Sequence, residues 1–144
     1  MGPVNIEGSS IRVLVVDDYE PFRRFVCSTL RKRPALRIVG EASDGVAAVQ
    51  QAEALNPDLI LLDVGLPRLN GLQAAREIRK LFPDSKIIFV SQESSPDVVQ
   101  EALSLGARGY VAKTRAASDL LAAVDAVLEG RLFVGSGLTT SDPD

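Results

Sequence analysis

The sequence predicts an α/β domain in which a parallel β-sheet is covered by helices on both faces. Short, almost purely apolar segments alternate five times with amphipathic segments of helical periodicity. This alternation is typical of strand–helix repeats that form a parallel sheet. The chain has 144 residues, of which 46% are hydrophobic. That is enough for one domain with its own core, and too apolar for a wholly disordered chain.

The first two strand–helix pairs lie before the turn Asn56-Pro57-Asp58. The predicted strands are 11–16 and 36–42, and the predicted helices are 20–32 and 45–55. Asp44 is a candidate N-cap of the second helix, because a short carboxylate can accept hydrogen bonds from the first helical amides. The apolar positions of the first helix keep helical spacing; they are Phe22, Phe25, Val26 and Leu30.

The remaining three pairs follow the same plan. The predicted strands are 59–62, 86–90 and 109–112, and the predicted helices are 70–81, 95–106 and a last helix that ends at Glu129. Asn70 is a candidate cap. Ser95-Pro96-Asp97 combines a cap, a proline in the first turn and an acid near the positive helix end. Gly106 suits the left-handed conformation that ends many helices.

The strand sequences also predict the order of the sheet. Strands 11–16, 59–62 and 86–90 are nearly all apolar, as central strands should be, whereas strand 36–42 carries two charges and strand 109–112 is short. This pattern fits the flavodoxin-like order 2-1-3-4-5, a three-layer (βα)5 sandwich. The chain is expected to consist of a flexible leader (1–10), the domain itself (11–130) and a tail or linker (131–144).

Composition excludes several classes of function. The net charge is −3 with a pI near 5, so the chain lacks the basic balance of a non-specific DNA binder. It contains no histidine, which excludes a Ser-His-Asp triad or a histidine-containing zinc site within it. No apolar run approaches the ~20 residues of a membrane-spanning helix. The single cysteine fits a reducing, cytoplasmic location.

Polar residues follow four of the five predicted strands. Asp17 and Asp18 end the first strand, Asp63 the third, Ser91 the fourth and Lys113 the fifth. In a parallel sheet these strand ends share one edge, where ligands bind. Three crowded carboxylates raise a pKa or bind a cation, and a hard oxygen site of this kind suits Mg²⁺. The hydroxyl and the ammonium can donate to an anion, and an aspartate can form an aspartyl-phosphate.

Four stretches carry a resemblance to a known family. VLVVDD (13–18), LILLDVGLP (59–67), VSQ (90–92) and GYVAK (109–113) resemble the receiver domain of two-component response regulators. The phrase IVGEASDG (38–45) and the stretch that starts at GYVAK (109–131) are similar to the LuxR-type (NarL/FixJ-like) subfamily. The resemblance covers about residues 11–130.

The resemblance implies a role for each site residue. Asp63 would be the phosphoacceptor. The domain would bind Mg²⁺ through Asp17, Asp18, Asp63 and the main-chain carbonyl of Gly65. The phosphoryl group would be bound by Ser91 and Lys113. Ser91 and Tyr110 would form the switch, and Gly65 and Gln92 would modulate access, since both depart from the residues common in the family. Thr114 stands where many receivers have proline.

The resemblance also implies partners. The phosphoryl group would come from a sensor histidine kinase or from small acyl phosphates, and phosphorylation could produce a homodimer. The chain would be the N-terminal part of a LuxR-type transcription regulator, contacting DNA only through a domain absent from this sequence, and it would not bind membranes. Its only chemistry would be self-phosphorylation and autodephosphorylation, so it would not be an enzyme in the usual sense.

Other interpretations remain open from the sequence. The chain could be a standalone receiver, or a pairing module that is never phosphorylated. A haloacid-dehalogenase-like phosphatase would need a second acid where Gly65 stands, and a nucleotide-binding module would need a glycine-rich loop that is absent.

A basic run is expected to be a solvated face or a docking surface for an acidic partner; it comprises Arg23, Arg24, Arg31, Lys32, Arg33 and Arg37. Cys27 is expected to be partly covered and inert.

Overall fold

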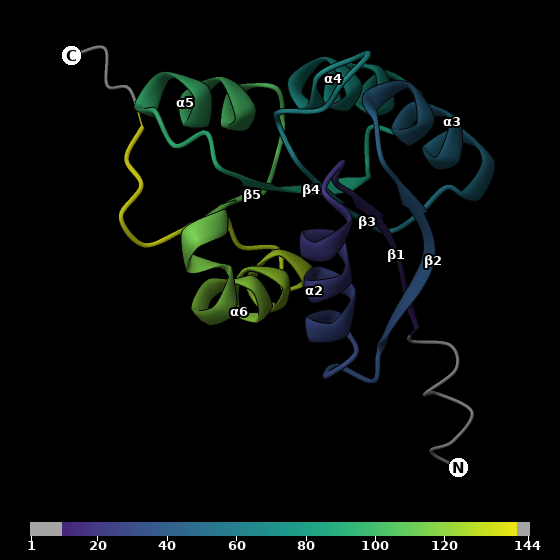
Figure 1. The fold of residues 1–144 in the computed structure, drawn as a ribbon, viewed down its shortest axis with the longest axis horizontal. Coiled ribbons are helices and arrows are strands. Elements are labelled where there is room, and N and C mark those ends of the chain that lie inside the picture. Colours follow the sequence, from purple (N-terminus) through teal and green to yellow (C-terminus); the bar gives the residue numbers. More distant parts are fainter. Residues whose placement is uncertain (1–9, 141–144) are drawn as a thin grey trace.

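The computed structural model describes residues 10–140. In this range the strands form one sheet in the order β2-β1-β3-β4-β5-β6, and every neighbouring pair is parallel (Figure 1). The strands are β1 (Ile11–Val16), β2 (Leu36–Ala42), β3 (Leu59–Leu62), β4 (Lys86–Ser91), β5 (Gly109–Ala112) and β6 (Phe133–Val134). The predicted α/β class and the order 2-1-3-4-5 are therefore confirmed, with one further strand added.

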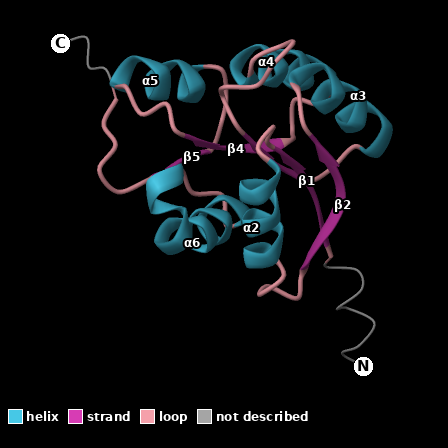
Figure 2. Ribbon diagram, viewed as in Figure 1, coloured by secondary structure: helices cyan, strands magenta, loops and turns pink. Residues whose placement is uncertain are grey.

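Helices lie on both sides of the sheet (Figure 2). Their bounds are α2 (Glu20–Leu30), α3 (Gly45–Leu55), α4 (Gly71–Leu81), α5 (Pro96–Ser104) and α6 (Ala116–Leu128), and a short 3-10 turn, η1 (Lys113–Arg115), leads into α6. One core cluster joins α3, α4 and α5 to the sheet, and the other joins α2 and α6 to it. The result is the predicted three-layer arrangement. None of the helices described is long and apolar enough to cross a membrane.

Local sequence sets where three of these helices begin. The side chain of Asp44 accepts a hydrogen bond from the amide of Ala47, 2.7 Å away. Asn70 and Gln73 exchange side-chain-to-backbone hydrogen bonds in a capping box. Ser95 accepts from the third helical amide of α5. The three predicted caps are thus confirmed, and each fixes the loop between a strand end and the next helix.

The packing of α2 differs from the prediction at two residues. Phe25 was expected on the buried face, but 37% of it is exposed. Cys27 was expected to be partly covered, but only 3% of it is exposed, next to the buried Val26 and Leu30. This side of the helix packs in one core cluster with residues of β1 and α6, such as Val13 and Leu120. Burial raises the pKa of the Cys27 thiol, which favours the unreactive protonated form.

A sixth strand follows α6, where the sequence analysis predicted a tail or linker. β6 pairs with β5, and the amide of Gly135 donates to the carbonyl of Tyr110 over 2.8 Å. Asp119 accepts hydrogen bonds from both the amide and the hydroxyl of Ser136. The domain therefore extends at least through these contacts. Residues 1–9 of the predicted leader and 141–144 of the predicted tail lie outside the described residues.

Candidate functional site

The carboxyl ends of β1 and β3 bring three aspartates together. Asp17 and Asp18 follow β1, and Asp63 follows the neighbouring strand β3. Each can offer a carboxylate oxygen, and these oxygens lie within 4.8 Å of one another. Asp17 and Asp63 are only 3% and 6% exposed, whereas Asp18 is exposed. The predicted acidic cluster is therefore present, with one member open to solvent and two set into the protein.

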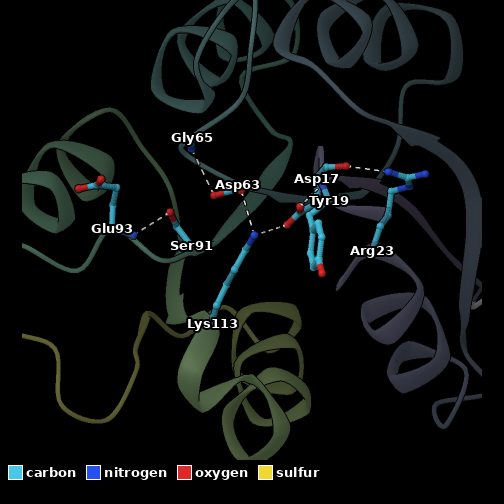
Figure 3. A network of polar contacts seen from close by, with 8 residues as sticks. All are labelled: Asp17, Tyr19, Arg23, Asp63, Gly65, Ser91, Glu93 and Lys113. Atoms are coloured by element: carbon cyan, nitrogen blue, oxygen red, sulfur yellow. Dashed lines mark hydrogen bonds and ion pairs between the residues drawn. The ribbon is translucent and has the colours of Figure 1, made fainter. Parts of the chain in front are cut away.

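Lys113 joins this cluster from the far side of β4 (Figure 3). Its Nζ lies 2.9 Å from Asp17 Oδ2 and 3.1 Å from Asp63 Oδ2, and also 4.6 Å from the centre of the Phe22 ring. One ammonium thus bridges two buried carboxylates. The resulting cluster holds three acids and one base, so it keeps a negative excess that can attract a divalent cation.

Burial and the neighbouring charges shift two of these groups. Burial raises the pKa of Asp17, and Asp63 raises it further, while hydrogen bonds from Lys113 and Tyr19 act in the opposite direction. For Lys113, burial acts to lower the pKa, but the hydrogen bonds and charges of the two aspartates outweigh it, and the pKa is raised. Lys113 is therefore a full cation at neutral pH.

Backbone amides orient both buried carboxylates. The amide of Tyr19 donates to Asp17 Oδ1 over 2.9 Å, and the amide of Gly65 donates to Asp63 Oδ1 over 3.2 Å. A side chain at Gly65 would meet no atom within 4 Å of its Cβ. The space beside Asp63 is consequently open, as an incoming reactant requires.

Ser91 and Tyr110 meet at a common residue on the other side of the cluster. Ser91, at the end of β4, is fully buried, and its Oγ accepts a hydrogen bond from the amide of Glu93 (3.1 Å). The hydroxyl of the fully buried Tyr110 donates to the carbonyl of the same Glu93 (2.5 Å). Burial raises the pKa of Tyr110 to about 12. The two residues predicted as the switch are thus linked through the loop that leads to α5.

An open cleft of about 550 Å³ unites these groups. Its lining comprises Asp18, Tyr19, Asp63, Gly65, Ser91, Gln92, Glu93 and Lys113. Asp17 and Tyr110 are buried outside this lining, and they contact it through Lys113 and Glu93 respectively. The structure brings all the residues predicted for the site to one edge of the sheet. Sequence reasoning missed Tyr19 and Glu93, whose main-chain groups make the contacts and whose side-chain type therefore gave no signal.

The basic run around α2 is partly neutralised. Arg23, Arg24 and Arg33 pair with Glu41, Glu20 and Asp125 respectively. The run is therefore not one continuous cationic surface. Whether it contacts an acidic partner stays a prediction.

Comparison with known proteins agrees with this geometry. A family model described as the response regulator receiver domain matches residues 13–125. The chain is 32% identical to the transcriptional regulatory protein DegU of Brevibacillus brevis, over 93% of this chain and 57% of that protein. It is 35% identical to the nitrate/nitrite response regulator NarL of Escherichia coli K12, over 88% of this chain and 59% of that protein. It thus spans less than two thirds of both relatives.

Solved structures show the same relationship. A two-component response regulator of the LuxR family from Aurantimonas sp. SI85-9A1 superposes with a TM-score of 0.82 at 30% identity, covering 87% of this chain and 89% of that one. The signal receiver domain of the putative response regulator NarL from Mycobacterium tuberculosis gives a TM-score of 0.79 at 33% identity, covering 85% and 99%. The chain therefore belongs to the response regulator receiver domain family, among relatives of the NarL and LuxR type.

Proposed function

We propose that this chain is a phosphorylation-dependent signalling domain in which Asp63 accepts a phosphoryl group. One observation carries the proposal: the Asp63 carboxylate reaches an open cleft while sharing Lys113 with Asp17, 3.1 Å and 2.9 Å away. A nucleophilic carboxylate, a cation and a cluster of acids are the parts that acyl phosphate formation needs. The phosphoryl donor would be a phosphohistidine on a sensor histidine kinase or a small acyl phosphate.

The residues present fit a bound Mg²⁺. Asp17, Asp18 and Asp63 offer carboxylate oxygens within 4.8 Å of one another, and the main-chain carbonyl of Gly65 would complete the protein ligands. Few protein oxygens beside an open cleft suit an ion that keeps several waters and shares phosphate oxygens. When bound, Mg²⁺ would neutralise charge on the carboxylates and on the phosphoryl oxygens.

The transfer step balances with Asp63 as nucleophile. A carboxylate oxygen of Asp63 forms a bond to phosphorus as the donor's P–N bond, or the P–O bond of an acyl phosphate, breaks. The bonding electron pair leaves with the imidazole nitrogen, which is protonated, or with the departing carboxylate. Gly65 holds one Asp63 oxygen through its amide, and Lys113 is placed to pair with the added charge. Neither group has to travel across the cleft.

Ser91 and Tyr110 would convert the added charge into a change of surface. Phosphorylation adds about −1.5 to −2 charges, and one hydrogen bond from Ser91 to that charge is worth about 1.5–3 kcal/mol. Switching a two-state domain fully requires about 5.5 kcal/mol, so Ser91 would act together with Lys113. Because Ser91 and Tyr110 both bond to Glu93, a shift at Ser91 would reach β5 and the start of α5.

The proposed output is transcription regulation through a further domain. The NarL and DegU relatives are longer than this chain and carry names of regulators, which supports its being the N-terminal part of a LuxR-type protein. A homodimer formed on phosphorylation is part of this proposal. A pairing module that is never phosphorylated is the alternative, and labelling decides between them.

Acetyl phosphate with Mg²⁺ should add one phosphoryl group to the chain, measured as intact mass. Asp63→Asn should abolish the gain, because an amide cannot form the acyl phosphate. An exposed aspartate outside the cleft, Asp97, serves as the matched control, and Asp97→Asn should label normally. No gain in the wild-type chain, or an equal gain in Asp63→Asn, would refute the proposal. Turnover of phosphate esters would instead favour a phosphatase.

Gln92→Ala should speed labelling by small phosphodonors several-fold. Gln92 is exposed and lines the cleft directly after Ser91, so its side chain narrows the path to Asp63. The rate is followed as the labelled fraction against time. Ser94→Ala changes the same exposed loop outside the cleft lining and should leave the rate unchanged. Equal rates in the wild type and Gln92→Ala would show that Gln92 does not control access.

A further inference from the structure

Arg23 connects the acidic cluster to β2 through two hydrogen bonds, and Figure 3 shows the one to Asp17. Its Nη1 donates to the main-chain carbonyl of Asp17 over 2.8 Å. Its Nε donates to Glu41 Oε1, also over 2.8 Å. The Arg23 side chain is 18% exposed, in contrast with the neighbouring Arg24, which is 76% exposed in its pair with Glu20. The guanidinium is thus held in one position between two elements.

The carbonyl that Arg23 holds belongs to the peptide unit joining Asp17 to Asp18. The Asp17 side chain has its own supports, the amide of Tyr19 and the ammonium of Lys113. Asp18 is exposed, and among the hydrogen bonds and ion pairs of residues 10–140 its side chain takes part in none. The direction of the Asp18 carboxylate therefore depends on its backbone, and Arg23 fixes the peptide plane that precedes it.

If Arg23 acted through its charge alone, it would weaken cation binding at the acidic cluster rather than support it. A cation beside an acidic cluster weakens the binding of a second cation, and Glu41 offsets that charge. A purely mechanical role, holding α2 against β2, would need only the pair with Glu41. The second hydrogen bond reaches the backbone of the acidic cluster itself, at the Asp17 carbonyl. It is explained if the guanidinium sets the geometry of the metal-binding acids.

We propose that Arg23 is a positioning residue for the divalent-cation site. Its guanidinium fixes the Asp17–Asp18 peptide and so aims Asp18 at the ion, and Glu41 orients the guanidinium. The planar fork of arginine can donate in two directions at once, which a lysine ammonium on a flexible stem cannot reproduce with the same geometry. This inference rests on the proposed function, because it assumes that the acidic cluster binds Mg²⁺.

Arg23→Lys should therefore weaken Mg²⁺ binding although the charge is unchanged. Removing an outer partner of a metal ligand costs about tenfold or more in affinity, so we expect the Mg²⁺ dissociation constant to rise about tenfold, measured by calorimetric titration of the whole chain. Labelling by acetyl phosphate should need correspondingly more Mg²⁺ and recover its wild-type rate when Mg²⁺ saturates. Glu41→Gln keeps an oxygen that accepts from Nε, so it should lose far less affinity than Arg23→Lys.

Arg24→Lys is the matched control, because Arg24 pairs with Glu20 on the same helix and forms no ion pair with the acidic cluster. The Mg²⁺ affinity of this variant should equal that of the wild type. A wild-type affinity in Arg23→Lys overturns the inference, and a lowered melting temperature without a change in Mg²⁺ affinity overturns it too, by showing a merely structural role. Weaker binding in Glu41→Gln but not in Arg23→Lys would show a charge effect and also overturn it. Absence of Mg²⁺ binding in the wild type would refute the proposed function itself.

Discussion

Replacing Lys113 by methionine should lower the free energy of unfolding by about 3 kcal/mol at neutral pH without Mg²⁺, because breaking a buried ion pair leaves uncompensated charge. Asp17 and Asp63 are both buried and share this one ammonium. Methionine has nearly the length of the lysine stem, so packing against Phe22 is largely kept and the change is mainly one of charge. Urea unfolding followed by circular dichroism measures the loss.

The loss in Lys113→Met should depend on pH and on Mg²⁺. The raised pKa of Lys113 means that the lysine stabilises the wild type fully below its ordinary pKa and loses this effect only as the pH rises through the raised value. In the variant, the two carboxyls repel each other, and protonation relieves the repulsion. The loss of unfolding free energy should therefore become smaller as the pH falls toward the values at which carboxyl groups are protonated. The pKa of Asp17 is already raised in the wild type, so this carboxyl takes up its proton at a higher pH than an ordinary aspartate. Added Mg²⁺ should make the loss smaller as well.

A matched change outside the site tests whether charge removal alone has this effect. Arg24→Met removes a cation from an exposed pair on α2, and such pairs contribute about 0–1 kcal/mol. It should lower the unfolding free energy slightly and without dependence on Mg²⁺. Equal stability of Lys113→Met and the wild type, at neutral pH without metal, would mean that Asp17 and Asp63 do not share a common counter-charge.

The sequence was sufficient for the sheet and for most of the site, because both follow from local patterns. Apolar strands bounded by turn residues, and helices bounded by caps such as Asp44 and Asn70, identify themselves within a few residues. Once the strands are taken as parallel, their carboxyl ends must share an edge. Asp17, Asp63 and Lys113 could therefore be placed together although they come from different strands.

The features that sequence analysis missed depend on contacts between distant segments. β6 has two residues in a glycine- and serine-rich stretch, and only the neighbouring edge of β5 makes it a strand. Cys27 is buried and Phe25 is part-exposed because the side of α2 that carries Val26 and Cys27 packs against β1 and α6. Arg23 looked like one member of a basic run, because nothing in its local sequence indicates that it donates to the Asp17 carbonyl.

Tyr110 should ionise only near pH 12, and its ionisation should destabilise the fold. Its pKa is raised by burial to about 12, from an ordinary value of 10.0. A raised value means that the neutral phenol stabilises the fold fully below pH 10 and that this stabilisation disappears as the pH rises toward 12. The loss is about 3 kcal/mol, because each pKa unit corresponds to about 1.4 kcal/mol. Tyr110→Phe should remove this alkaline loss, and at neutral pH it should cost about 1–2 kcal/mol, because the Glu93 carbonyl loses its donor.

The composition of the chain makes this measurement direct. It has two tyrosines and no tryptophan, so the ultraviolet absorbance of tyrosinate reports only Tyr19 and Tyr110. Tyr19 is 62% exposed, whereas Tyr110 is fully buried. Part of the absorbance change of the wild type should occur only near pH 12, and Tyr110→Phe should lose that part, which separates Tyr110 from Lys113 in the same alkaline range. Absence of an absorbance change near pH 12 in the wild type would show that the Tyr110 hydroxyl is open to solvent. The link from Ser91 through Glu93 to β5 would then be absent, because it requires that hydroxyl to be buried against the Glu93 carbonyl.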